Sequence, residues 1–525
     1  MAHLLRCTLN KRSSAVGEGQ IAKKGSGEVK QMLNRRDFLK AAGLLALWPS
    51  GCLHQASEQT GTVVNDVQSQ LNPTRVAHIV SVDSVEAIRM AVHSAQREGK
   101  AVCIAGGRHA MGAQQFGTGA VLVDTTRLNR VLSFDPKEGI VEVEAGIQWP
   151  ELIEYLLTVQ KGQAHQWGII QKQTGADRLS IGGAIAANVH GRGLRLKPII
   201  ADIESLVLVD RYGNLRTCSR RENAELFRLV IGGYGLFGIV SSVTLRLVPR
   251  TKVERVVEVI DVEDLMVAVE EKVSDGFLYG DFQFSCDDKS DDFLRRGVFS
   301  CYRPVDENTP IPQGQKRLST QQWKDLVRLA HNAKGEAFEK YATHYLSTSG
   351  QIYWSDIQQL SEYLDDYHRP LDRSLGAVDR ATETITEIYV PRDALIVFLD
   401  EVRDDFRKNH VEAIYGTIRL IERDEESFLS WAREPYACII FNLHTVHTPE
   451  GLQHSAAAFQ RLIDMAIRRG GSYYLTYHKY ATREQVLTCY PQFPEFLRLK
   501  RQYDPEERFQ SDWYRHYKKM FADVL

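Results

Sequence analysis

The stretch that decides the fold is Ala105-Gly106-Gly107-Arg108-His109-Ala110-Met111-Gly112-Ala113-Gln114, which directly follows a short apolar run at 101–105. An apolar run that ends in paired glycines predicts a strand followed by a tight turn. Because glycine has no Cβ, successive backbone N–H groups in such a turn can face an anion and form a nest. The spacing matches neither a GxGxxG nor a Walker loop, so the turn alone predicts only an anion site.

Two more glycine-rich segments follow. Residues 173–193 read QTGADRLSIGGAIAANVHGRG, and residues 232–240 read GGYGLFGIV. Small side chains allow a backbone to approach a flat ligand closely. The alternative interpretation of 173–193 is a tightly packed helix, and that of 232–240 is a turn leading into a strand.

In this order and spacing, the three segments resemble the vanillyl-alcohol-oxidase type of FAD-binding oxidoreductase, which carries a PCMH-type FAD domain. The resemblance covers roughly residues 75–250 and implies an α+β fold that binds FAD in an elongated groove between two subdomains. It also implies a set of cofactor-binding residues in the three segments. These are Gly106, Gly107, Arg108, His109, Ala110, Gly112, Asp177, Gly182, Gly183, Asn188, His190, Gly235, Gly238 and Ile239.

The histidine of the first segment has a further implication. In many members of this family, the histidine of a Gly-Arg-His motif is bonded covalently to the 8α-methyl group of the flavin, and His109 stands at that place. The resemblance therefore implies FAD attached through His109, whereas the plain alternative is a hydrogen-bonded loop histidine. No cysteine occurs between 104 and 217, which excludes a second, cysteine-based link there.

The C-terminal half carries a finer resemblance. Tyr490-Pro491 and the residues up to Asp512 are similar to the closing segment of decaprenylphosphoryl-ribose oxidases, while residues 387–391 and 418–420 resemble the substrate domain of aldonolactone and alditol oxidases. This resemblance implies three catalytic residues, Glu387, Arg419 and Lys479, with Cys438 as an active-site cysteine. The spacing of Lys479 from Tyr490-Pro491 is, however, about two residues shorter than in the ribose oxidases. The alternatives for the four residues are a surface glutamate, a salt-bridged arginine, a solvated lysine and a core cysteine.

The function implied is oxidation of a CH–OH group of a sugar, polyol or aldonolactone-like substrate, by hydride transfer to flavin N5 with oxygen or a quinone as acceptor. One alternative is a flavin enzyme acting on C–N or C=C bonds, of the cytokinin-dehydrogenase or sterol-reductase type. Another is a non-catalytic exported flavoprotein.

Composition excludes several other classes. The chain has 525 residues, of which 43% are hydrophobic and 25% charged, and its net charge is 65 − 67 = −2. This is the composition of an ordinary globular protein, with no basic field that would hold nucleic acid. The eight cysteines form no C-x-x-C pair, and no metal site is predicted.

The N-terminus is typical of an export signal. Residues 34–40 read NRRDFLK and precede a weakly apolar run at 41–48, a pattern that resembles a twin-arginine signal. The protein is then expected to use the twin-arginine export machinery and to reach the periplasm or the outer face of the membrane. Cys52 is a candidate for lipid attachment and a membrane tether. The alternative is a basic helix start followed by a core helix.

The chain divides into five predicted parts. One series of strand and helix patterns runs from 253 to 285 and a second from 385 to 469, and two such units predict an antiparallel sheet with helices on one face, whereas 286–350 gives no readable pattern. The parts are an export signal with its lipoprotein site at 1–52, a linker at 53–72, an FAD domain at 73–250, a substrate (cap) domain at 251–470, and a segment returning to the FAD domain at 471–525.

Overall fold

The computed structural model describes residues 61–525 except 363 and 365. They belong to one compact unit that runs from Thr60 to Leu525. The twin-arginine motif at 34–40 and Cys52 lie outside the described residues. The fold is α+β, as predicted, and is built on three larger sheets and two short strand pairs.

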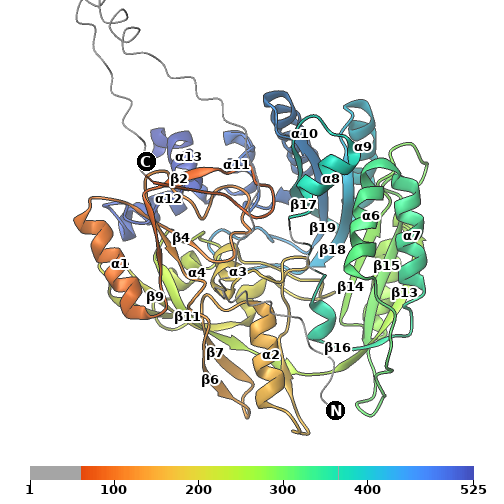
Figure 1. The fold of residues 1–525 in the computed structure, drawn as a ribbon, viewed down its shortest axis with the longest axis horizontal. Coiled ribbons are helices and arrows are strands. Elements are labelled where there is room, and N and C mark those ends of the chain that lie inside the picture. Colours follow the sequence, from red (N-terminus) through yellow and green to blue (C-terminus); the bar gives the residue numbers. More distant parts are fainter. Residues whose placement is uncertain (1–60, 363, 365) are drawn as a thin grey trace, which may run out of the picture. The chain divides into compact units, whose positions relative to one another are not determined.

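A small parallel sheet positions the glycine turn at 106–112 (Figure 1). Helix α1 (Val85–Arg97) begins where the Ser84 side chain accepts a hydrogen bond from Ala87 N, and it buries Ile88 and Val92. The strands, in the order β3-β5-β4, are His78–Ser81, Val121–Asp124 and Val102–Ala105. Gly106 therefore stands at the carboxyl end of an edge strand, where backbone groups are free to face a ligand.

An antiparallel sheet in the order β10-β9-β11-β7-β6 forms the second layer of this region. Its strands are Leu215–Ser219, Ile203–Val209, Ile239–Arg246, Ile140–Glu144 and Val131–Asp135. The helices here are α2 (Trp149–Val159), α3 (Ile181–Ala187) and α4 (Ala224–Val230). Helix α3 lies within the second glycine-rich segment and buries Ala184 and Ile185 completely. Residues 181–187 of that segment thus form a packed helix.

The strand pairs β1-β2 and β12-β8 complete the region. Their bounds are Thr62–Val64 with Thr74–Val76, and Val248–Pro249 with Trp167–Gly168.

The largest sheet has eight strands, and every pairing between them is antiparallel. Their order is β16-β13-β15-β14-β18-β19-β17-β20. In that order the bounds are Ile352–Trp354, Lys252–Asp261, Arg296–Pro304, Tyr279–Phe284, Ala413–Ile421, Tyr436–Val446, Ala381–Pro391 and Ser472–Tyr473.

The two faces of this sheet differ in chemistry. Pairing aligns Phe282, Ile418, Ile439 and Ile388 in one row, and this apolar face packs in a single core with α5 (Leu265–Ser274), α9 (Leu395–Lys408) and α10 (Pro449–Ile467). Because side chains alternate along a strand, the next row exposes the opposite face. That row holds Gln283, Thr417, Ile440 and Glu387.

The helices of the two predicted units, α5, α9 and α10, share the apolar face of the sheet as expected, but two further helices cover the second face. Helix α6 (Thr320–Asn332) contacts β18, and helix α7 (Lys334–Leu346) lies beside β13 and β15 (Figure 1), where Ala342 packs on Val257 and Val298. Helix α8 (His368–Leu375) follows them. Both α6 and α7 lie in the stretch 286–350 that gave no readable pattern, and few of their residues are buried.

The C-terminal segment packs against the first sheet. Helices α11 (Arg483–Cys489) and α12 (Phe493–Tyr503) precede a turn where Asp504 accepts hydrogen bonds from Arg508 N and Phe509 N, and α13 (Asp512–Met520) follows. The residues after this turn pair alongside β4, because Val102 N donates to Arg508 O at 2.6 Å. The C-terminal segment is thereby held beside the strand that leads into Gly106. The predicted domain boundaries themselves stay predictions.

No helix in the described part of the chain is long and apolar enough to cross a membrane.

Candidate active site

The turn after β4 forms a row of free backbone donors. The N–H groups of Gly106 to Ala110 donate to no carbonyl or side chain within the described residues. Arg108 has a φ of 59°, in the left-handed region that such nests use. Five free donors in a short turn provide a site for a pyrophosphate-like anion.

The second glycine-rich segment packs directly on this turn. A Cβ at Gly106 would overlap Ser180 Oγ, and a Cβ at Gly107 would overlap the Arg178 carbonyl. A Cβ at Gly112 would likewise overlap the Tyr477 carbonyl. Glycine is required at these positions because the neighbouring segments leave no room for a Cβ atom. Side chains here would also fill the space in front of the free N–H groups.

His109 lies in this turn as a neutral imidazole. Burial is the main reason that the pKa of His109 falls to about 4, with the charge of Arg178 acting in the same direction. Above that pH the ring has an unprotonated nitrogen that can act as a nucleophile.

Asp177 is engaged by the protein itself. Its Oδ1 lies 2.6 Å from Nζ of the fully buried Lys172, and its Oδ2 accepts a hydrogen bond from Ser361 N at 2.8 Å. A buried ion pair of this kind fixes the start of the second segment and leaves little of the carboxylate for a ligand.

Several other expected cofactor residues serve packing through their side chains. The Asn188 amide donates to Asp424 Oδ2 at 2.9 Å and accepts from Ile200 N at 3.1 Å. A Cβ at Gly238 would overlap Leu208, and Ile239 is completely buried. Gly182 and Gly183 lie in α3, and Gly235 has a positive φ of 73° beside Ile104. A cofactor contact at these positions would have to come from the backbone.

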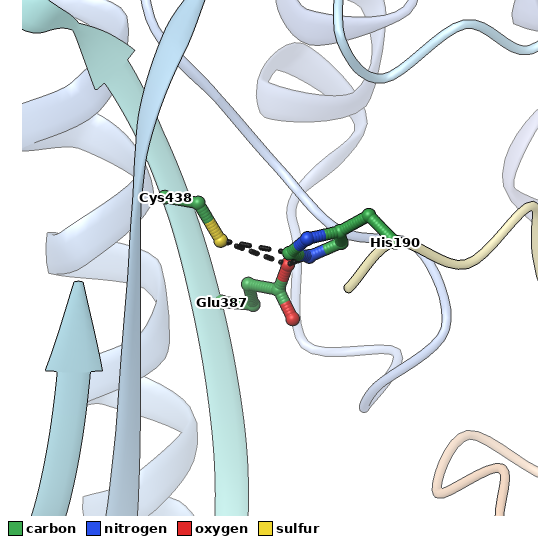
Figure 2. Close-up of side chains that lie close together, drawn as sticks. All are labelled: His190, Glu387 and Cys438. Atoms are coloured by element: carbon green, nitrogen blue, oxygen red, sulfur yellow. Dashed lines mark hydrogen bonds and ion pairs between the residues drawn. The ribbon is translucent and has the colours of Figure 1, made fainter. Parts of the chain in front are cut away.

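His190, Glu387 and Cys438 meet in the buried centre shown in Figure 2. His190 Nε2 lies 2.6 Å from Glu387 Oε1, and Cys438 Sγ donates to the same oxygen at 3.1 Å. The hydroxyl groups of Tyr389 and Tyr477 donate to Oε1 and Oε2 at 2.7 and 2.9 Å. Glu387 thus accepts four hydrogen bonds from four separate segments of the chain.

The charge state follows from these contacts. Burial raises the pKa of Glu387, but the charge of His190 and the hydrogen bonds from His190, Tyr389 and Cys438 outweigh burial and bring the pKa to about 2. Burial raises the pKa of the Cys438 thiol well above its usual range, and the neighbouring Glu387 carboxylate adds to the effect. The centre therefore holds an ionised carboxylate and a protonated thiol, and Glu387 is a poor proton acceptor.

Three ligand-type atoms of this centre lie within 4.8 Å of one another, which would admit a metal ion. The imidazole, the thiol and Tyr389 all direct a hydrogen toward the same carboxylate oxygen, however. The arrangement is that of a hydrogen-bonded centre built around one anion.

Arg419 and its neighbours offer free polar groups on the same sheet face. Arg419 pairs in register with Cys438 across β18 and β19. Within the described chain, Arg419 Nε, Thr417 Oγ1 and both amide atoms of Asn442 are buried without a hydrogen-bond partner. Because a buried polar group left unpaired costs about 1–3 kcal/mol, this row indicates a binding surface for a ligand rich in hydroxyl or carbonyl groups.

Lys479 is not brought to this centre. Within the described residues no hydrogen bond or ion pair joins Lys479 to Glu387 or Arg419; burial lowers the pKa of Lys479, and the charge of Asp512 opposes that shift. Tyr477, two residues earlier, reaches Glu387. The catalytic role of Lys479 stays a prediction.

Sequence reasoning also missed the partnership of His190 with Glu387. The two residues are 197 positions apart, and no local pattern links them. Tyr389 could have been found, since alternation along a strand puts it on the same face as Glu387.

Acid solution should weaken the centre in a defined window. The pKa of Glu387 is lowered from 4.5 to about 2, so the ionised carboxylate stabilises the folded state above about pH 4.5 and loses that contribution as the pH falls toward 2. Glu387→Gln should therefore unfold at a lower temperature than the wild type near neutral pH, and the difference should shrink below about pH 4.5.

Thermal unfolding followed across this pH range measures the effect. The matched control is Glu425→Gln, because Glu425 is 60% exposed. A difference in unfolding temperature that stays constant over the whole range would contradict the assignment of an ionised, paired Glu387.

Comparison with known proteins gives a consistent identification. A family model described as an FAD binding domain matches residues 76–219. The chain is 25% identical over 408 residues to L-gulono-1,4-lactone dehydrogenase of Mycobacterium tuberculosis, covering 76% of this chain and 86% of that protein. It is 24% identical over 456 residues to decaprenylphosphoryl-beta-D-ribose oxidase of Mycolicibacterium smegmatis, covering 83% and 94%. A third relative, D-arabinono-1,4-lactone oxidase of Yarrowia lipolytica, is 33% identical over 188 residues, 35% of this chain and 34% of that protein.

These matches span both the glycine-rich segments and the large sheet, and they agree with the free amide turn at 106–110. The protein is an FAD-dependent oxidoreductase. The chain is similar to the FAD-binding oxidoreductases with a PCMH-type FAD domain, in the group that includes aldonolactone oxidases and dehydrogenases and decaprenylphosphoryl-ribose oxidases.

Proposed function

We propose that this protein oxidises a CH–OH group of a sugar, polyol or aldonolactone-like substrate. The observation that carries the proposal is the row of unpaired polar groups on the large sheet, Arg419 Nε, Thr417 Oγ1 and the Asn442 amide, beside the Glu387 centre. A polyhydroxylated molecule supplies donors and acceptors for such a row, whereas an apolar amine or alkene does not. The names of the similar lactone and ribose enzymes support the same substrate class.

The residues present fit an FAD. The free N–H groups of 106–110 would hold the pyrophosphate, and the missing Cβ atoms of Gly106 and Gly107 keep that cradle open. When bound, the flavin supplies a hydride acceptor at N5.

The chain's own groups would orient the substrate and stabilise charge. Arg419 carries a permanent positive charge and would stabilise negative charge developing on the substrate oxygen. The Tyr477 hydroxyl, held by Glu387 at 2.9 Å, keeps its oxygen lone pairs for a substrate hydroxyl. Burial raises the pKa of Tyr477 well above its usual range, and Glu387 adds to the shift, so this group stays a neutral phenol.

Anaerobic reduction of the bound flavin tests the substrate class. Sugars, polyols and aldonolactones should bleach the flavin, and amines should not. Arg419→Met should lower kcat/KM by about 10²–10³, the usual loss when one stabilising donor is removed. The matched control is Arg423→Met, because that side chain is 59% exposed on the same segment.

If only amines bleached the flavin, the enzyme would act on C–N bonds and the proposed substrate class would be wrong. A flavin that no compound of either panel reduces would favour the non-catalytic alternative. Equal kcat/KM for Arg419→Met and Arg423→Met would remove Arg419 from the site.

We also propose that the FAD is covalently attached through His109. The support is the position of this neutral imidazole within the free-amide turn and its pKa of about 4. Mass spectrometry of denatured wild-type protein should show the polypeptide plus one FAD. His109→Ala should lose the added mass and still bind FAD, while His165→Ala, a change at an exposed loop histidine, should keep it. A wild-type polypeptide without added mass would reject the link and leave FAD binding intact.

We propose, from the twin-arginine pattern at 34–40, that the folded holoprotein is exported by the twin-arginine machinery to the periplasm or the outer face of the membrane. We further propose Cys52 as a lipid tether and oxygen or a quinone as the electron acceptor. Replacing Arg35 and Arg36 together by Lys should retain the protein in the cytoplasm, whereas Arg12→Lys should not. Cell fractionation measures the outcome. Export of the double variant at the wild-type level would contradict the proposal.

A further inference from the structure

A second cluster of ligand-type side chains lies on the same sheet face, apart from the centre around Glu387. Glu383 of β17 is its middle, and it is 1% exposed. Around it stand His331 of α6, His368 of α8 and His444 of β19, and these four residues are called the Glu383 cluster. Glu383 and Glu387 are four positions apart along one strand, which places their Cα atoms roughly 13 Å apart.

The ligand atoms of the Glu383 cluster converge. His331 Nε2 lies 2.8 Å from Glu383 Oε1, and His368 Nε2 lies 2.6 Å from Oε2. The nitrogen of His444, directly opposite Glu383 in the β17–β19 pairing, joins them: one atom each from His331, Glu383 and His444 lie within 4.8 Å of one another. Two histidines and one carboxylate at this spacing match the first shell of a zinc-type site.

The outer contacts orient the histidines as ligands. His331 Nδ1 lies 2.8 Å from the Val327 carbonyl, so Nδ1 donates its hydrogen to that carbonyl and the ring is held with Nε2 facing the cluster. The Tyr367 hydroxyl donates to Glu383 Oε2 at 2.6 Å, next to His368. One oxygen of Glu383 is thus fixed by Tyr367 and His368, and the other is left for an ion shared with His331.

His444 supplies an independent indication of a missing partner. Its Nδ1 is buried and has no hydrogen-bond partner in the described chain. A buried ring nitrogen without a partner is available to bind a cation. His331 and His444 meet edge to face, with ring centroids 5.4 Å apart. Without an ion, two neighbouring imidazoles would crowd one carboxylate while a buried nitrogen stays unsatisfied.

We propose that the Glu383 cluster binds a divalent first-row transition ion of the zinc type, through His331, His444 and one oxygen of Glu383. His368 and Tyr367 are positioning residues that hold the second oxygen. Zinc–nitrogen and zinc–oxygen distances are about 2.0–2.2 Å, so the contact between His331 and Glu383 would open by about half an ångström to admit the ion. A fourth position is left for water.

The ion would have a structural role. It would tie α6, on the segment between β15 and β16, to strands β17 and β19 of the large sheet. The ion would lie four positions along β17 from Glu387 and two positions along β19 from Asn442, at the end of the unpaired polar row.

Metal content of the full-length holoprotein tests this site. Protein made without a histidine tag is loaded with zinc chloride, passed through a gel-filtration column and analysed by mass spectrometry for zinc per chain. The wild type should retain one zinc. His331→Ala and His444→Ala should retain none, His368→Gln should bind about 10–100-fold more weakly, and His454→Ala, a change at an exposed helix position, should retain one.

X-ray absorption of the zinc-loaded wild type separates this site from the centre around Glu387. Only nitrogen and oxygen neighbours should appear, because zinc at His190, Glu387 and Cys438 would show a sulfur at about 2.3 Å. Cys438→Ser should accordingly keep its zinc. A chelator should lower the unfolding temperature of the wild type and not that of His444→Ala.

Two results would overturn the proposal: wild-type protein that leaves the column without zinc, or a zinc site with a sulfur neighbour. If the alanine variants misfold and lose their FAD, the X-ray absorption spectrum of the zinc-loaded wild type still identifies the ligands of the ion. Since the readout is metal content, it stands whether or not the chain oxidises a CH–OH group.

Discussion

The buried ion pair of His190 and Glu387 is the interaction on which the rest of the site depends. An ionised carboxylate at 2% exposure is stable only where several donors replace water, and Glu387 has four. Those donors come from the loop after α3, from β17 itself, from β19 and from the segment before α11. One anion therefore fixes how the glycine-rich region and the large sheet meet.

The same anion sets what its neighbours can do chemically. With all four donors directed at it, Glu387 stays charged, Cys438 stays a thiol and Tyr477 stays a phenol. The charge that remains for a ligand is that of Arg419. We therefore interpret Glu387 as the group that holds His190 and Tyr477 in place.

Close backbone packing is the second constraint. Gly106, Gly107 and Gly112 each stand where another segment leaves no room for a Cβ. The same turn has a functional feature, because the five N–H groups of 106–110 have no acceptor within the described residues. The same turn is tied to the active centre through residue 477, whose carbonyl lies at Gly112 and whose hydroxyl lies at Glu387.

The sequence by itself determined the α+β class, the FAD-type glycine turns and the strands that carry Glu387 and Arg419, because these depend on local features: glycine spacing and alternation along a strand. It did not reveal the pairing of His190 with Glu387, the contact of Tyr477 with Glu387, or helices on both faces of the sheet. Only the tertiary structure decided those, because each depends on which distant segments share one low-dielectric interior. A buried charge must find its donors wherever the fold brings them, and 197 residues of intervening chain leave no local trace of that requirement.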